Sequence, residues 1–79
     1  MSDEALRRLA WQCRRGMLEL DELLLDFLER GYPELAPALQ RRFQCLLEED
    51  DSRLFQWLFE EPGQAPAEYQ ALIRRMRGE

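Results

Sequence analysis

The stretch Arg14-Arg15-Gly16-Met17-Leu18-Glu19-Leu20 separates two apolar patterns and decides how this chain folds. Apolar residues recur at helical spacing on both sides of it, as Leu6, Leu9, Ala10 and Cys13 before it and as Leu20, Leu23, Leu24, Phe27 and Leu28 after it. Gly16 lies between the two patterns, and a glycine can adopt positive φ at no steric cost. The sequence therefore predicts a helix-turn-helix corner at Gly16.

The charges around Gly16 have a structural explanation of their own. Arg14 and Arg15 come just before the glycine, where cations complement the carbonyl end of a helix. Glu19 and Asp21 come just after it, near the amide end of the next helix. By these local rules alone the corner is a plain connector, so a functional role needs further support.

The length and composition predict one soluble domain. A chain of 79 residues buries only about 60% of its unfolded surface on folding, which is enough for a single core. Hydrophobic residues make up 46% and charged residues 34%, and no apolar run approaches the ~20 residues of a membrane span. The polar start Met1-Ser2-Asp3-Glu4 does not resemble a signal peptide. We expect a single helical domain over residues 1–79, located in the cytoplasm and without membrane contact.

Several residue types are missing from the chain. It contains no Val, Thr, Asn, His or Lys, and Ile73 is the only β-branched residue, so nothing favours a strand. The predicted fold class is all-α. Without histidine the chain has no ready general base near neutral pH and no imidazole ligand. We therefore expect neither an enzyme nor a metal site, and we assign no catalytic residue.

The charge balance excludes one class of partner. Eleven arginines against sixteen acidic residues give a net charge of −5, whereas binding to a phosphate backbone needs a concentrated positive face. Nucleic acid is therefore not expected as a partner. A local arginine surface that pairs with carboxylates of a protein remains open.

Five helices are expected, at residues 3–15, 20–30, 37–49 and 52–60 and from Pro66 onward. Ser2 or Asp3 would cap the first. Gly31 and the following proline would end the second, while a further proline, Pro37, suits the first turn of the third. Asp50 or Asp51 would cap the fourth. The acidic run around them lacks the ligand spacing and glycine of a calcium loop.

Three side chains allow two interpretations each. Trp11 lies off the centre of its apolar stripe, and packing at the edge of the core is favoured over an exposed contact. Cys13 and Cys45 each lie on the apolar side of a predicted helix and are expected to be buried free thiols. The alternative for Cys13 is a reactive thiol whose pKa is lowered by Arg14 and Arg15.

Several motifs together resemble a known family. Arg15-Gly16-Met17-Leu18-Glu19 matches the pattern Arg-Gly-x-x-Glu. Leu46-Leu47-Glu48, Asp50-Asp51 and Leu54-Phe55-Gln56-Trp57-Leu58 follow in the same order and spacing as in that family. Over about residues 8 to 60 the chain is similar to the SdhE-type succinate dehydrogenase flavinylation (FAD assembly) factors.

The resemblance implies a small five-helix bundle with a chaperone-like task. Such a protein binds the flavoprotein subunit of succinate dehydrogenase, or of related fumarate reductases, and promotes covalent attachment of FAD to a histidine there. Because this chain has no histidine, the acceptor would belong to the partner. The chain also offers no Gly-rich phosphate loop after a strand, so we expect that it does not bind FAD tightly on its own. We expect it to act as a monomer.

The resemblance also implies which residues contact the partner. They are Arg15, Gly16 and Glu19 in the signature, and by extension Arg8, Trp11, Arg14, Met17 and Asp21 around it. Two alternatives of other classes remain at this point. One is the antitoxin component of a toxin-antitoxin pair, and the other is a generic helical protein-binding adaptor in which Gly16 matters only for folding.

Overall fold

The computed structural model describes residues 3–78, and this part of the chain forms five α-helices and no strand, which confirms the predicted all-α class. The helices are α1 (Asp3–Gln12), α2 (Leu18–Arg30), α3 (Pro37–Leu46), α4 (Asp51–Phe55) and α5 (Ala67–Met76). Short 3-10 turns, Tyr32–Glu34 and Pro62–Gln64, precede α3 and α5, and a π-helical turn, Gln56–Glu60, continues α4.

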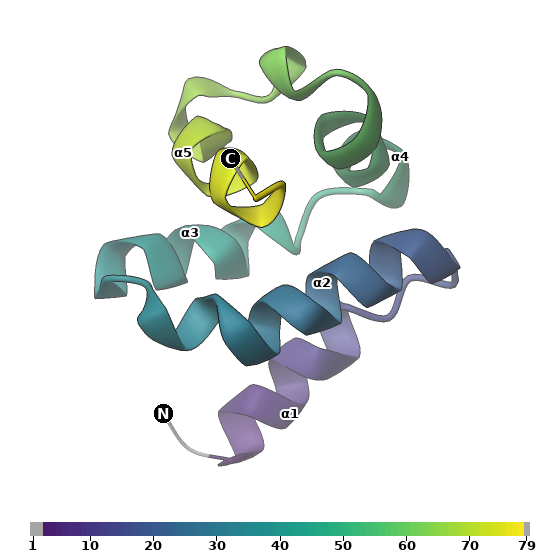
Figure 1. The fold of residues 1–79 in the computed structure, drawn as a ribbon. Coiled ribbons are helices and arrows are strands. Elements are labelled where there is room, and N and C mark those ends of the chain that lie inside the picture. Colours follow the sequence, from purple (N-terminus) through teal and green to yellow (C-terminus); the bar gives the residue numbers. More distant parts are fainter. Residues whose placement is uncertain (1–2, 79) are drawn as a thin grey trace.

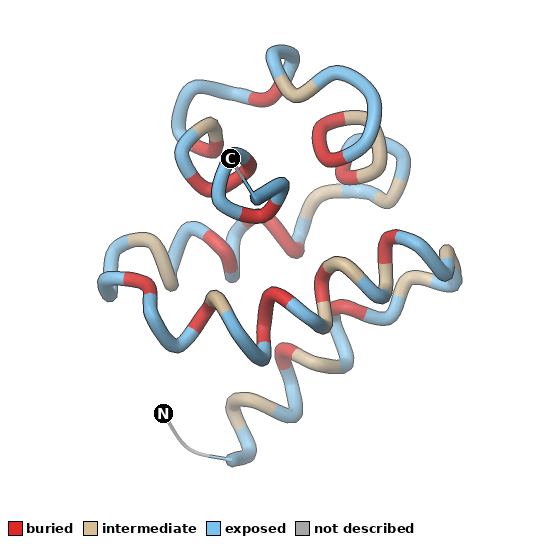
Figure 2. Tube along the Cα trace, in the orientation of Figure 1, coloured by how far each residue is buried: buried red, intermediate tan, exposed pale blue. Residues whose placement is uncertain are grey.

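Helix α2 lies between α1 and α5. It contacts α1 on one side and α5 on the other, while α3 packs against α5, so that α3, α4 and α5 form a second layer above the α1/α2 pair (Figure 1). In Figure 2 the buried residues recur along the helices between exposed ones. The first helix pair therefore forms one edge of the bundle, with the Gly16 turn at its end.

The core is apolar throughout the described residues, which bury no polar or charged side chain. Helix α5 buries Tyr69, Leu72, Ile73 and Met76. Phe43 of α3 packs against two aromatic rings, with centroid distances of 5.5 Å to Phe27 and 5.3 Å to Tyr32. These tilted ring contacts join α2, the following 3-10 turn and α3.

The first two helices end and begin earlier than the sequence suggests. Helix α1 ends at Gln12 rather than Arg15, and α2 begins at Leu18 rather than Leu20. The first difference arises because the backbone N–H of Arg15 donates to the carboxylate of Asp21 at 2.7 Å instead of to a carbonyl of α1. The cap that we proposed at Ser2 lies outside the described residues.

The next two helices differ in similar ways. Helix α3 ends at Leu46 rather than residue 49, and α4 begins one residue early at Asp51. Asp50 is confirmed as the cap of α4, because its side chain accepts from the backbone N–H of Arg53 at 2.9 Å. None of the helices among residues 3–78 is both long and apolar enough to cross a membrane.

The structure corrects two burial predictions. Trp11 is 76% exposed, so the prediction that it packs at the core edge is wrong. It lies two residues from the buried Leu9, which places it about 200° away around the helix. Cys45 is exposed rather than buried, and the same two-residue offset separates it from the buried Phe43. Cys13 is fully buried, as predicted.

Gly31, at the end of α2, has to be a glycine for a steric reason. Its φ of −95° is open to any residue, but a Cβ added there would clash with Cε1 and Cδ1 of the Phe27 ring. Phe27 is itself buried in the core and has little room to move. A glycine at this position therefore lets the Phe27 ring pack over the backbone.

We expect Gly31→Ala to destabilise the fold by about 1–3 kcal/mol, because the new methyl group overpacks the core against Phe27. Gly63→Ala is the matched control, since a Cβ there meets no atom within 4 Å. Urea unfolding of both variants gives the comparison. Equal stability of the two would contradict the steric explanation.

Candidate functional site

The turn between α1 and α2, residues 13–17, is called the Gly16 corner below. Gly16 has a φ of +81°, so the predicted positive φ is confirmed. The residue is exposed, and a Cβ added to it would meet no atom within 4 Å. The backbone of the corner is therefore accessible from solvent at Gly16.

Asp21 fixes the corner from the first turn of α2. One carboxylate oxygen accepts from the backbone N–H of Arg15 at 2.7 Å, and the other accepts from that of Gly16 at 3.3 Å. Two backbone donors that have left the α1 hydrogen-bonding pattern are satisfied in this way. Asp21, predicted as a partner contact, thus has a role inside the chain.

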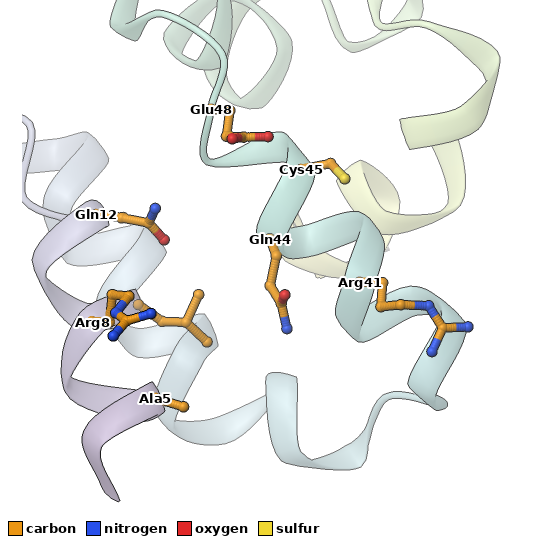
Figure 3. A pocket seen from close by; sticks show the side chains of 8 residues that line it. Ala5, Arg8, Gln12, Arg41, Gln44, Cys45 and Glu48 are labelled. Carbon is orange, nitrogen blue, oxygen red and sulfur yellow. The ribbon is translucent and has the colours of Figure 1, made fainter. Parts of the chain in front are cut away.

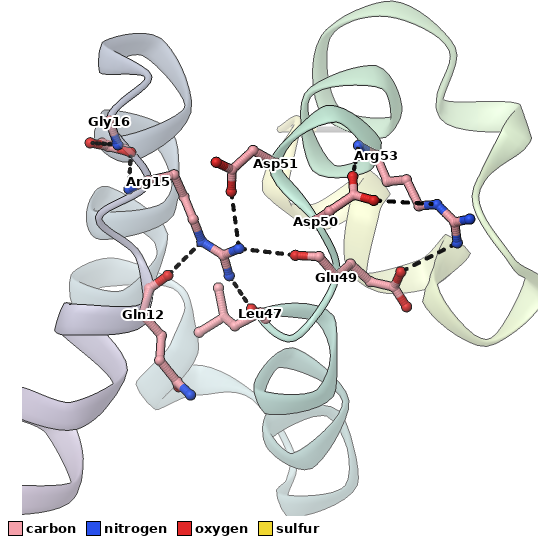
Figure 4. A network of polar contacts seen from close by, with 9 residues as sticks. Gln12, Arg15, Gly16, Leu47, Glu49, Asp50, Asp51 and Arg53 are labelled. Atoms are coloured by element: carbon pink, nitrogen blue, oxygen red, sulfur yellow. Dashed lines mark hydrogen bonds and ion pairs between the residues drawn. The ribbon is translucent and has the colours of Figure 1, made fainter.

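The side chain of Arg15 joins the corner to the other layer of the bundle (Figure 4). Its Nε donates to the carbonyl oxygen of Gln12 at 2.7 Å, at the end of α1. Its Nη1 donates to the carbonyl of Glu49 at 2.9 Å and to the carboxylate of Asp51 at 3.2 Å, and its Nη2 donates to the carbonyl of Leu47. We call this set of bonds the Arg15 network.

The Arg15 network brings together two motifs that are 32 to 36 residues apart in sequence. The signature around Gly16 and the segment from Leu47 to Asp51 both occur in the family pattern, and they contact each other here. The Arg15 side chain is only 13% exposed. A partner contact by Arg15 stays a prediction, but it would have to use this small remaining surface.

The other residues in and around the signature differ in how far they are exposed. Arg14 and Glu19 are exposed, and Met17 is half-buried against the core. Trp11 and Leu18 are 76% and 72% exposed, which makes them the most exposed large apolar residues among those described. Leu18 was missed by sequence reasoning. The sequence did contain an indication of its exposure, because Leu18 lies two positions before Leu20 and therefore off the buried helix face that begins there.

Arg8 faces a groove of about 440 Å³ between α1 and α3 (Figure 3). From α1 the groove is lined by Ala5, Arg8, Leu9 and Gln12, and from α3 and its end by Arg41, Gln44, Cys45 and Glu48. Sequence reasoning missed the second set. Its spacing of i, i+3, i+4 and i+7 would have indicated one helix face, but nothing in the sequence indicated which helix lies opposite.

Burial controls the chemistry of Cys13. It raises the pKa of the thiol to about 11, and the nearby positive charge of Arg15, which lowers the pKa, does not compensate. Asp21 adds to the increase. The reactive-thiol alternative therefore finds no support, and Cys13 is a core residue.

The arrangement defines a class of protein. Within residues 3–78 no group of three or more His, Cys, Asp and Glu side chains could hold a metal ion. What the fold offers is a small helical bundle with an exposed helix-turn-helix corner, which an internal arginine holds to the opposite layer. The model of the family described as "Flavinator of succinate dehydrogenase" matches residues 7–79, and the chain belongs to this family.

Curated relatives from several bacteria are similar to the chain. A protein of Pseudomonas aeruginosa named FAD assembly factor SdhE is 43% identical over 75 residues, covering 94% of this chain and 89% of the relative. Proteins of the same name from Haemophilus ducreyi and Aliivibrio fischeri are 37% and 47% identical, covering 89% and 72% of this chain and 85% and 66% of the relatives. No solved structure matches the chain.

Arg15→Ala should destabilise the protein by about 2–3 kcal/mol, because it leaves the part-buried carbonyl oxygens of Leu47 and Glu49 without their donor. Arg14→Ala is the control, since Arg14 is exposed, and it should change the stability by less than about 0.5 kcal/mol. Thermal and urea unfolding measure both. Similar stability of the two variants would show that the Arg15 network contributes little.

Thiol labelling should separate the two cysteines. At pH 8 a thiol of pKa about 11 is thiolate in only about one molecule in a thousand, and Cys13 is also fully buried. Cys45 is exposed. We expect a maleimide to modify Cys45 alone in the folded protein and both thiols in urea, as read by mass spectrometry. Equal labelling of both without denaturant would contradict the burial of Cys13.

Proposed function

We propose that this protein binds the flavoprotein subunit of succinate dehydrogenase and promotes covalent attachment of FAD to that subunit. Family membership supports the proposal. The observation that carries it is the Gly16 corner, whose backbone is open to the outside while Arg15 and Asp21 hold it from within. A surface that is fixed before binding loses less conformational freedom on association.

The side chains around the corner suggest how docking would occur. Gly16 lets the partner's backbone approach closely, because no Cβ stands in the way. Trp11 and Leu18 supply apolar surface of the kind that forms the centre of protein interfaces. Glu19 is exposed and available for charge-assisted hydrogen bonds, which fix the orientation of the two proteins.

In this proposal the protein acts by orientation. The chain contains no histidine, so the residue that receives the flavin belongs to the partner. A flavoprotein held with its isoalloxazine ring beside that residue reacts faster because the geometry is prepared in advance. The assembly factor then needs no catalytic group and no tightly bound FAD of its own.

Finer points extend the proposal. The family resemblance supports action on fumarate reductase flavoproteins as well, which would present a similar subunit to the same corner. We also propose that the protein works as a monomer in the cytoplasm. The exposed large apolar residues of the described part are only Trp11, Leu18 and Phe59, a small set compared with the apolar centre of most stable homodimers.

Gly16→Arg and Gly16→Ala test whether the corner is an interface. Both replace a glycine of positive φ, and each should lose about 1 kcal/mol or more of stability. Only the arginine also projects a bulky group from the corner. We expect Gly16→Arg to abolish flavinylation at temperatures where circular dichroism shows a folded bundle, while Gly16→Ala retains most of it.

The measurement is covalent flavin fluorescence of the flavoprotein subunit in a denaturing gel. If the two variants lose activity in proportion to their loss of stability, Gly16 is only a structural connector. That result would favour a generic helical adaptor over the docking role proposed for the corner.

A further inference from the structure

The groove between α1 and α3 contains two arginines, Arg8 and Arg41. Among residues 3–78 the side chains of Arg8 and Arg41 take part in no recorded hydrogen bond or ion pair, in contrast to Arg15, Arg42 and Arg53. Both are exposed and both line the same groove. In a chain of net charge −5, two unpaired cations in one depression form a local site for a negative group.

The remaining lining residues add hydrogen-bonding groups of both kinds. Gln12 and Gln44 extend into the gap from opposite sides, and Glu48 lies at its upper end (Figure 3). The amide of Gln44 is oriented by a bond of 2.9 Å to the hydroxyl of the buried Tyr32. The groove therefore combines cations, amides and one carboxylate on side chains from both helices.

We propose that this groove binds an acidic segment of the partner protein, with one carboxylate of that segment paired to Arg8 on α1 and another paired to Arg41 on α3. The inference rests on the function proposed above, since it takes the flavoprotein subunit as the partner. Guanidinium groups suit this task because they bind carboxylates through two parallel hydrogen bonds. Arg41, Gln44 and Glu48 would thereby join the docking surface.

The chemistry of the groove favours a polypeptide over a dinucleotide. No aromatic residue lines it, so it offers no surface on which a flavin or adenine ring could stack. Glu48 would repel a pyrophosphate. The same carboxylate and the amide of Gln12 can instead accept and donate hydrogen bonds to the main chain of a bound segment.

The groove is continuous with the Gly16 corner. Gln12 lines the groove with its side chain, and its carbonyl oxygen accepts the bond from Nε of Arg15. Trp11 is the preceding residue, so α1 carries groove residues and corner residues on adjoining faces. A partner docked on the corner has only to extend along α1 to reach Arg8 and Arg41.

The test compares charge reversals of two exposed arginines. The dissociation constant for the purified flavoprotein subunit is measured by calorimetry for the wild type, Arg41→Glu, Arg74→Glu and, as a variant of the corner, Glu19→Ala, with folding checked by circular dichroism. Arg74 is exposed on α5 and does not line the groove. We expect Arg41→Glu to weaken binding at least tenfold and Arg74→Glu to weaken it less than twofold.

Three outcomes of this comparison would overturn the proposal. Equal weakening by both variants would indicate a general charge effect. Unchanged binding of Arg41→Glu together with weakened binding of Glu19→Ala would remove the groove from the interface and leave the proposed function intact. A wild type that fails to bind the flavoprotein subunit would overturn both the groove proposal and the proposed function.

A second measurement identifies the occupant. Cys45 is an exposed thiol that lines the groove, so a thiol-linked photo-crosslinker can be attached there while Cys13 stays buried. We expect the captured flavoprotein peptide to contain Asp or Glu beside the crosslinked residue. A peptide without acidic residues, or binding of free FAD that Arg41→Glu abolishes, would contradict an acidic protein segment as the occupant.

Discussion

The guanidinium group of Arg15 makes the contacts on which the geometry of this bundle depends. It reaches from the end of α1 to the carbonyls of Leu47 and Glu49 and to the carboxylate of Asp51, across the joint between the two layers. Including the carbonyl of Gln12, its side chain donates to three backbone carbonyls. Because three planar donor groups are used at once, a lysine could not replace it. The position of the whole corner relative to α3 and α4 follows from this one side chain.

The residues from Arg15 to Asp21 fall into two groups, those that bond to other parts of the chain and those that face solvent. Arg15 and Asp21 bond to other parts of the chain, whereas Gly16 and Glu19 face outward beside the exposed Leu18. The short segment from Arg15 to Asp21 therefore contains both residues that bond within the fold and residues that face solvent. Rules for helix ends and turns explain the residue types that bond within the corner. They do not explain the exposed apolar side chains of Trp11 and Leu18 beside it.

Much of the fold could be predicted from the sequence, because helical periodicity, the two turn-forming glycines and the missing β-branched residues all indicate helices. The exposure of Trp11 and Cys45 could not be predicted, since it depends on which helix face meets a neighbour. The inward role of Arg15 was likewise hidden: its partners are carbonyls more than thirty residues away, and a backbone carbonyl leaves no trace in residue types. Sequence reasoning placed the corner correctly but did not find the groove beside it.

The two tryptophans of this chain lie in opposite environments. Trp57 is 5% exposed, with its ring centroid 6.1 Å from that of Tyr69, whereas Trp11 stands in solvent next to the corner. Indole fluorescence responds to the polarity around the ring, so the chain contains two optical reporters with separate meanings. Emission from Trp57 follows the integrity of the core, and emission from Trp11 follows whatever covers α1. Spectroscopy of the unlabelled protein can therefore distinguish docking from unfolding in a single sample.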